Sequence, residues 1–212
     1  MELRPVKVTA ARKRKNDPEG VRSRILDATA RLFQAQGYHA TGMRRVMQVT
    51  GLSSGALHHH FATKDALALA VIKERVAPVV RETWVDPVRT AGSLGTTVQV
   101  VFSEIVRGIE QRKAVAGCPL NNLAMELSFS NPQLREPLRA IFQEWQTTLA
   151  ARIGATHGGV PMDRAQRMEA ASFVISVYSG AMNLAKTAQS ALPLRAAARH
   201  LKEWLLEQGF SP

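Results

Sequence analysis

Three consecutive histidines, His58 to His60, are the densest group of side chains able to do chemistry in this sequence. An imidazole nitrogen either binds a metal ion or donates a hydrogen bond to an anion such as phosphate. Successive residues of a helix point to different faces, so three adjacent rings do not converge on one ion. We therefore expect no metal site. His58 and His59 are expected to contact phosphate, and His60 to pack or cap near a helix end.

The single cysteine, Cys118, is the other side chain with reactive chemistry. It precedes Pro119 at an expected helix start, where a thiol pKa is lowered, and Arg112 and Lys113 are near in sequence. Sensing of an oxidant or electrophile is one interpretation, and a small buried core residue is the other, which we favour. One cysteine also excludes a disulfide framework and fits a reducing compartment.

The charge distribution indicates the class of partner. The 212 residues contain 28 Lys and Arg against 17 Asp and Glu, a net charge of +11. Residues 1–75 carry 14 basic and 6 acidic side chains and therefore hold +8 of this excess. Such a basic segment is typical of proteins that meet DNA, RNA or an anionic membrane, although a solvated surface is the alternative. Residues 1–16 are expected to form a disordered basic arm.

The composition bounds the fold and the compartment. Hydrophobic residues make up 45% and charged residues 21% of the chain, which excludes wholesale disorder. No apolar run approaches the roughly 20 residues that span a bilayer, so we expect no membrane partner. The N-terminal segment lacks the apolar stretch of a secretory signal, and we expect a cytoplasmic protein.

Apolar residues recur at helical spacing, and no alternating pattern bounded by hairpin turns indicates a strand. We therefore predict an all-α fold of about nine helices. Asp17 and Pro18 are expected to begin the first helix, and Thr63 the fourth, with Pro78 and Pro87 bracketing its end. The later apolar stripes run over residues 94–109, 120–127, 134–153, 171–185 and 194–205.

Residues 41–61, TGMRRVMQVTGLSSGALHHHF, are the most informative part of the chain. They predict two short helices, the first capped by Thr41, joined by a tight turn in which Gly51 permits the bend and Leu52 fills the core. In a helix-turn-helix the first helix crosses the DNA backbone, and the start of the second reaches base edges in the major groove. The residues at that start are small: Ser53, Ser54, Gly55 and Ala56.

One pattern extends over three of the predicted helices and consists of Arg24, Ile25, Leu26, Ala28, Phe33, Gly37, Tyr38, Thr41, Val46, Gly51, Leu52, Ser53, Gly55, Leu57, His60, Phe61, Lys64 and Leu67. With this pattern, residues 22–67 resemble the DNA-binding domain of the TetR family of bacterial transcriptional regulators. His58 replaces a tyrosine that commonly contacts phosphate in that family, a role that histidine can also fill. Met47 and Thr50 replace small residues, and we expect helix packing to shift slightly.

The resemblance implies a set of DNA contacts. Lys64 lies in the first turn of the fourth helix, where a lysine opposes the helix dipole unless a phosphate binds beside it. Arg44 and Arg45 lie on the helix expected to cross the DNA backbone. The full set of expected DNA contacts is Thr41, Arg44, Arg45, Ser53, Ser54, Gly55, Ala56, His58, His59 and Lys64.

A second stretch, GCPLNNLAME at residues 117–126, is similar to part of the ligand domain of some TetR-family members. That similarity implies a small-molecule pocket in the C-terminal half and a dimer bundle built by the last two helices. Small residues between 170 and 185 and a leucine stripe over 194–205 support the dimer independently. The expected pocket residues, each with plain core packing as the alternative, are Phe102, Cys118, Phe142, Trp145, Phe173, Tyr178 and Met182.

The sequence thus predicts a basic arm (1–16), a helix-turn-helix DNA-binding domain (17–67) and a ligand-binding and dimerisation domain (68–212). The predicted function is that of a homodimeric regulator, a repressor that releases a pseudo-palindromic DNA operator when an unidentified small-molecule inducer binds, without a cofactor. One alternative is a non-specific architectural DNA-binding protein. Another is a metal-dependent enzyme using the histidines, although no carboxylate-plus-histidine spacing supports it.

Overall fold

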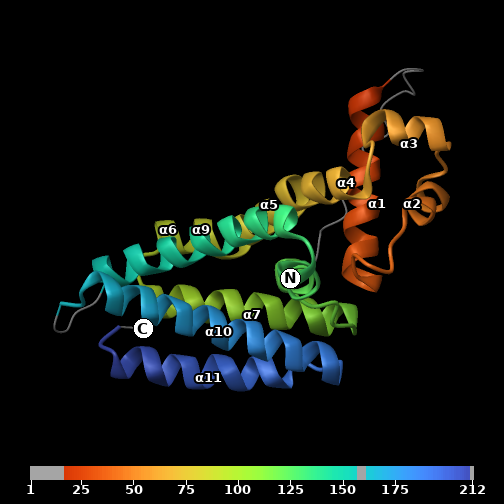
Figure 1. Cartoon of the computed structure of the whole chain (residues 1–212). Coiled ribbons are helices and arrows are strands. Elements are labelled where there is room, and N and C mark those ends of the chain that lie inside the picture. The colour runs from red at the N-terminus through yellow and green to blue at the C-terminus, as the bar shows by residue number, and fades with distance from the viewer. Residues whose placement is uncertain (1–16, 157–160, 211–212) are drawn as a thin grey trace.

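The computed structural model describes residues 17–156 and 161–210, and every regular element in these residues is a helix (Figure 1). The N-terminal part consists of α1 (Pro18–Gln36), α2 (Met43–Thr50) and α3 (Ser54–His60). One continuous run follows, made of α4 (Lys64–Val71), η1 (Ile72–Val76), α5 (Ala77–Val80), η2 (Arg81–Val85) and α6 (Asp86–Thr90). The remaining helices are α7 (Leu94–Arg112), α8 (Pro119–Ser130), α9 (Pro132–Thr156), α10 (Arg164–Ala188) and α11 (Leu192–Glu207).

When the run from Lys64 to Thr90 is counted as one helix, the described residues hold nine helices, which confirms the predicted fold class. The predicted domain boundary after residue 67 falls inside this run. The expected arm, residues 1–16, lies outside the described residues. No helix in the described part is long and apolar enough to cross a membrane.

The predicted end of the fourth helix is wrong, because the helix passes through both Pro78 and Pro87. A proline inside a helix removes one N–H donor and its ring clashes with the carbonyl four residues earlier. Each proline is preceded by a five-residue π segment, η1 before Pro78 and η2 before Pro87. The wider π turn accommodates the proline ring, so the helix continues instead of stopping.

Side-chain caps fix the ends of the N-terminal helices. Asp17 caps α1, Ser53 caps α3 and Thr63 caps α4, each accepting a hydrogen bond from a backbone N–H two or three residues into its helix. Such caps stabilise a helix by about 1 kcal/mol each. Short helices such as α2 and α3 also depend on burial, and Val46 and Leu57 bury them in the hydrophobic core with almost no exposed surface.

Two ion pairs attach α1 to the long run. Arg22 Nη1 lies 2.5 Å from Glu74 Oε2, and Arg75 Nε lies 2.6 Å from Asp27 Oδ1.

The C-terminal helices form the other part of the molecule, in which α10 packs between α9 and α11, and α11 packs against α7 (Figure 1). The helix-turn-helix therefore lies at one end of the molecule, away from α11.

Candidate nucleic-acid interface

The chain between α2 and α3 makes the tight turn of a helix-turn-helix. Gly51 ends α2 with φ +69°, a left-handed conformation that favours glycine. Leu52 is half-buried and packs against the core, as expected. Ser53 Oγ then accepts a hydrogen bond from Ala56 N at 3.2 Å and begins α3.

The start of α3 is open to a partner. Ser53, Ser54 and Gly55 are exposed, and Ala56 is half-buried. A side chain added at Gly55 would meet no atom within 4 Å, so the backbone of the first turn is itself accessible. His58 and His59 are exposed one turn later. This arrangement is what insertion of a helix N-terminus into the major groove requires.

Helix α2 carries its charge on the surface. Arg44 and Arg45 are both exposed, and Arg45 Nη1 lies 3.4 Å from Gln48 Oε1. Gln48 is also exposed and was not among the predicted contacts, although its place one turn after Arg44 was a usable signal. The substitutions expected to shift packing are accommodated, since Met47 packs against the core and Thr50 Oγ1 donates to Val46 O at 2.8 Å.

Thr41 is not the cap of α2, contrary to the prediction. The N-cap is Gly42, which has no side chain to accept a hydrogen bond. Thr41 is 1% exposed, and its hydroxyl donates to Gly37 O at 2.7 Å. The hydroxyl therefore closes the turn between α1 and α2 and is not available to a phosphate.

Lys64 is held within the chain in this structure. Its ammonium lies 4.1 Å from the centre of the Tyr38 ring and 3.3 Å from His39 O. Desolvation lowers the pKa of Lys64, opposed by the nearby carboxylates of Asp65 and Glu126. The Tyr38 hydroxyl donates a hydrogen bond to Asp65. The pKa of Tyr38 is raised, mainly by burial and secondly by this hydrogen bond. A phosphate contact by Lys64 stays a prediction, because its ammonium has other partners here.

Two of the three histidines contact each other through their rings. The rings of His59 and His60 meet edge to face with centroids 5.4 Å apart, and His60 packs beside Phe61. Within residues 17–156 and 161–210, no three His, Cys, Asp or Glu side chains lie together as a metal site would need. Phosphate contact by His58 and His59 stays a prediction.

Three of the seven predicted pocket residues form a packed aromatic cluster instead of lining an open cavity. Phe102, Trp145 and Tyr178 are fully buried, and the Tyr178 ring centre lies 5.6 Å from that of Trp145 and 5.9 Å from that of Phe102. Cys118 and Met182 are buried as well. Trp84, which the sequence analysis missed, sits at the centre, 4.8 Å from Tyr178 and 4.9 Å from Trp145.

Two predicted pocket residues lie at or beyond the edge of this cluster. Phe142 is half-buried and stacks on Trp145 with ring centres 6.4 Å apart. Phe173 is 43% exposed and lies against Trp204, 4.6 Å away. The assignment of Phe173 to a pocket is therefore wrong, because its helical position turns it toward α11.

Three polar atoms inside the cluster are buried and meet hydrogen-bond geometry with no partner among the described residues: Trp84 Nε1, Trp145 Nε1 and the Tyr178 hydroxyl. Burial raises the pKa of Tyr178 and also that of Cys118. Cys118 is the N-cap of α8, as predicted, and it is buried, as the favoured interpretation of a core residue requires; the lowered thiol pKa is wrong, because desolvation outweighs the helix terminus. Buried polar groups normally form hydrogen bonds, so three unsatisfied polar atoms in one place require an explanation.

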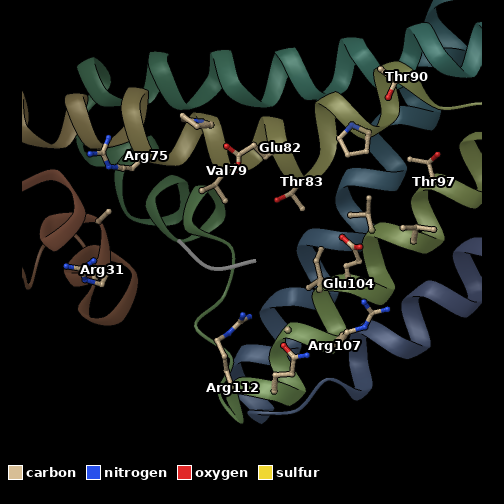
Figure 2. A pocket seen from close by; sticks show the side chains of 18 of the residues that line it. Arg31, Arg75, Val79, Glu82, Thr83, Thr90, Thr97, Glu104, Arg107 and Arg112 are labelled. Carbon is tan, nitrogen blue, oxygen red and sulfur yellow. The ribbon is translucent and has the colours of Figure 1, made fainter. Parts of the chain in front are cut away.

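A cleft of about 1490 Å³ lies elsewhere, between α1, the run from α4 to α6, and α7 (Figure 2). Figure 2 shows Arg31, Arg75 and Glu82 entering from two sides and Glu104 and Arg107 from α7. None of the seven predicted pocket residues lines it. Its charges are mixed and partly paired, as in the contact of Arg75 with Asp27, so they select no one class of ligand.

Comparison with known proteins identifies both halves of the chain. Residues 25–71 match the family described as bacterial regulatory proteins, tetR family, and residues 95–200 match the C-terminal domain of LmrA/YxaF-like transcriptional regulators. The HTH-type transcriptional regulator LmrA of Bacillus subtilis is 29% identical over 174 residues, 82% of this chain and 90% of that protein. The HTH-type transcriptional repressor AcnR of Corynebacterium glutamicum is 41% identical over 68 residues, 31% of this chain and 36% of that protein.

A solved structure extends the similarity to three dimensions. The crystal structure of a TetR transcriptional regulator from Chloroflexus aurantiacus superposes with a TM-score of 0.78 at 30% identity. The match covers 92% of this chain and 98% of that one. The helix-turn-helix and the C-terminal helices therefore occur together in a known architecture.

Proposed function

The chain belongs to the TetR family of bacterial regulatory proteins, and we propose that it is a ligand-responsive repressor that binds its operator as a homodimer. Members of this family are DNA-binding transcriptional regulators and not enzymes. The observation that carries the proposal is the open first turn of α3, where Ser54 and Gly55 are exposed beside the capped end of the helix. The name of the relative AcnR, a repressor, favours repression over activation.

In the proposed complex α3 enters the major groove and α2 crosses the phosphate backbone. Ser53 to Ala56 read base edges, while Arg44, Arg45, His58 and His59 contact phosphates. The cytoplasm is the compartment where such a protein meets bacterial DNA. We propose a DNA-binding domain over residues 17–67 and a ligand-binding and dimerisation domain over residues 68–212; separate family matches to residues 25–71 and 95–200 support a division into two parts.

The dimer is proposed to form through α10 and α11, where large apolar side chains lie on the surface. Phe173 is 43% exposed, Leu184 62%, Leu192 71% and Leu206 45%. Gly180 on α10 has nothing within 4 Å of its side-chain position, which leaves room for a neighbouring helix. A twofold axis through this face would present two copies of α3 to half-sites about 34–36 Å apart.

The ligand is proposed to enter the aromatic cluster. Trp84 Nε1, Trp145 Nε1 and the Tyr178 hydroxyl supply three buried donors with no well-formed hydrogen bond among the described residues, and the rings supply flat apolar walls. A guest that fits must bring hydrogen-bond acceptors, and no charged side chain belongs to the cluster to bind an ion. Because the rings fill the space, binding requires the helices to separate, and this links ligand binding to the position of the DNA-binding domain.

Selection of bound sequences from random duplexes tests the DNA-binding proposal. The expected product is an inverted repeat, and equilibrium sedimentation of the complex should give two chains per site. Recovery of no motif would instead support the non-specific architectural protein. Recovery of single half-sites bound by one chain would contradict the dimer.

A further inference from the structure

The turn between α1 and α2 is held from outside the DNA-binding domain by one carboxylate of α8. Glu126 Oε1 accepts a hydrogen bond from Tyr38 N at 3.0 Å, and Glu126 Oε2 accepts one from His39 N at 3.0 Å. Hydrogen bonds to an ionised carboxylate are about twice as strong as neutral ones, and two parallel bonds also fix orientation.

Gly37 makes this close approach possible. A side-chain carbon at Gly37 would lie 2.5 Å from Glu126 Oε1, and the residue has φ +85°, which favours glycine. The glycine that ends α1 therefore also provides the space for the carboxylate. Thr41 N donates a hydrogen bond to Tyr38 O at 3.1 Å. This bond connects the turn held by Glu126 directly to the start of α2.

A second bond from the same part of the chain reaches the start of α4. Asn131 Nδ2, directly after α8, donates to Asp65 Oδ2 at 3.0 Å, and Asp65 also accepts from the Tyr38 hydroxyl. These two bonds lower the pKa of Asp65 and keep it ionised. We call Glu126 and Asn131 together the α8 clamp, because they form hydrogen bonds to the DNA-binding domain at two places, the turn between α1 and α2 and the start of α4.

We infer that the α8 clamp sets the orientation of the helix-turn-helix relative to the C-terminal domain, and thereby the separation of half-sites that the dimer accepts. The inference rests on the proposed dimeric DNA binding. Glu126 and Asn131 are positioning residues, since neither lies on the exposed face of α2 or α3. Without the clamp, the two recognition helices adopt a wider range of separations, while each still reads the same bases.

Glu126→Gln is the most direct test, because it preserves size and replaces one acceptor oxygen by a donor that faces a backbone N–H. Glu136→Gln is the matched control, since Glu136 is an exposed α9 residue paired only with Arg139 of its own helix among the described contacts. Binding is measured on duplexes with identical half-sites whose separation changes in single base-pair steps. The wild type and the control should prefer one separation by about tenfold, the effect of one such hydrogen bond.

Glu126→Gln should reduce that preference to less than about threefold, with the same base preference within each half-site. Asn131→Asp is the second variant. It keeps the oxygen that accepts from Leu134 N but places a carboxylate against Asp65, so it should broaden the tolerated separations even if Glu126→Gln fails to fold.

The outcomes separate the two levels of inference. A wild type that binds all separations equally contradicts the proposed two-headed dimer. A selective wild type whose preference survives in the folded clamp variants overturns the role of the α8 clamp. A change of base preference within the half-site would show that the clamp shapes α3 itself, and would equally overturn the inference.

Discussion

Replacing Tyr178 by phenylalanine should stabilise this protein, although it removes a polar group from the centre of the core. The side chain has no exposed surface, and its hydroxyl has no hydrogen-bond partner among the described residues. The Cys118 thiol lies beside it, but sulfur is a weak acceptor and the two groups do not meet hydrogen-bond geometry. Trp84 Nε1 also approaches the hydroxyl without meeting hydrogen-bond geometry, so on folding the hydroxyl loses its bonds to water and gains only weak contacts in return.

The magnitude follows from the cost of burying an unpaired hydroxyl, about 1–3 kcal/mol in proteins. Tyr178→Phe keeps the ring and its edge contacts to Trp84 and Phe102, so packing changes little. We expect the free energy of unfolding to rise by about 1–3 kcal/mol. The assay is urea unfolding followed by circular dichroism at one fixed protein concentration, because a dimer's apparent stability depends on concentration.

Tyr38→Phe is the matched control, because the Tyr38 ring is also buried but its hydroxyl donates to Asp65. Losing this bond should lower the free energy of unfolding by about 1 kcal/mol, after allowance for the partly exposed carboxylate. If Tyr178→Phe instead destabilises the protein as much as Tyr38→Phe does, the Tyr178 hydroxyl has a partner in solution. The argument for an unpaired donor cluster would then fail.

Three further outcomes are expected. The Cys118 thiol should react with a thiol reagent many times more slowly in the native than in the unfolded protein, because burial raises its pKa; equal rates would contradict this burial. The folded-state pKa of Asp65 is lowered, so its contribution to stability is present in full above the unfolded value of about 3.9 and is lost as pH falls from there through the lower folded-state value. Unfolding of the wild type should therefore depend more steeply on pH between about 5 and 3 than that of Asp65→Asn, and parallel curves would refute this. Ala56→Gln should change which sequences are preferred, whereas Lys64→Ala should weaken binding to all of them alike; reversed effects would show that base and phosphate contacts are misassigned.

The local features of the fold were predictable because they depend on neighbours in sequence. Asp17, Ser53 and Thr63 cap their helices, and Gly51 makes its turn, through contacts within a few residues. The exposed start of α3 follows from the same short-range pattern. The path of the long run through Pro78 was not predictable, because a proline usually ends a helix and the compensating π segment has no clear sequence signature.

The missed residues lie in contacts that join distant parts of the chain. Trp84 falls between Pro78 and Pro87, where the sequence indicated the end of a helix, and its partners Trp145 and Tyr178 are far along the chain. Aromatic residues at helical spacing predicted that a cluster exists. Only the fold shows that the rings fill the interior of this cluster and leave its N–H and O–H donors without hydrogen bonds.

Helix α8 connects the aromatic cluster to the turn between α1 and α2. It starts beside the cluster, and its Glu126 binds the turn. Its N-cap, Cys118, is buried beside Tyr178, and Glu126 lies eight residues along the same helix. At 1.5 Å per residue the two points are about 12 Å apart on one continuous helix. In the proposed ligand-responsive regulator, a guest that separates the aromatic rings would displace the start of α8, and the helix would transmit this displacement to its later turns. The carboxylate that holds the Tyr38–His39 turn would move with it, so the helix that we propose limits the separation of the recognition helices would also connect them to the core.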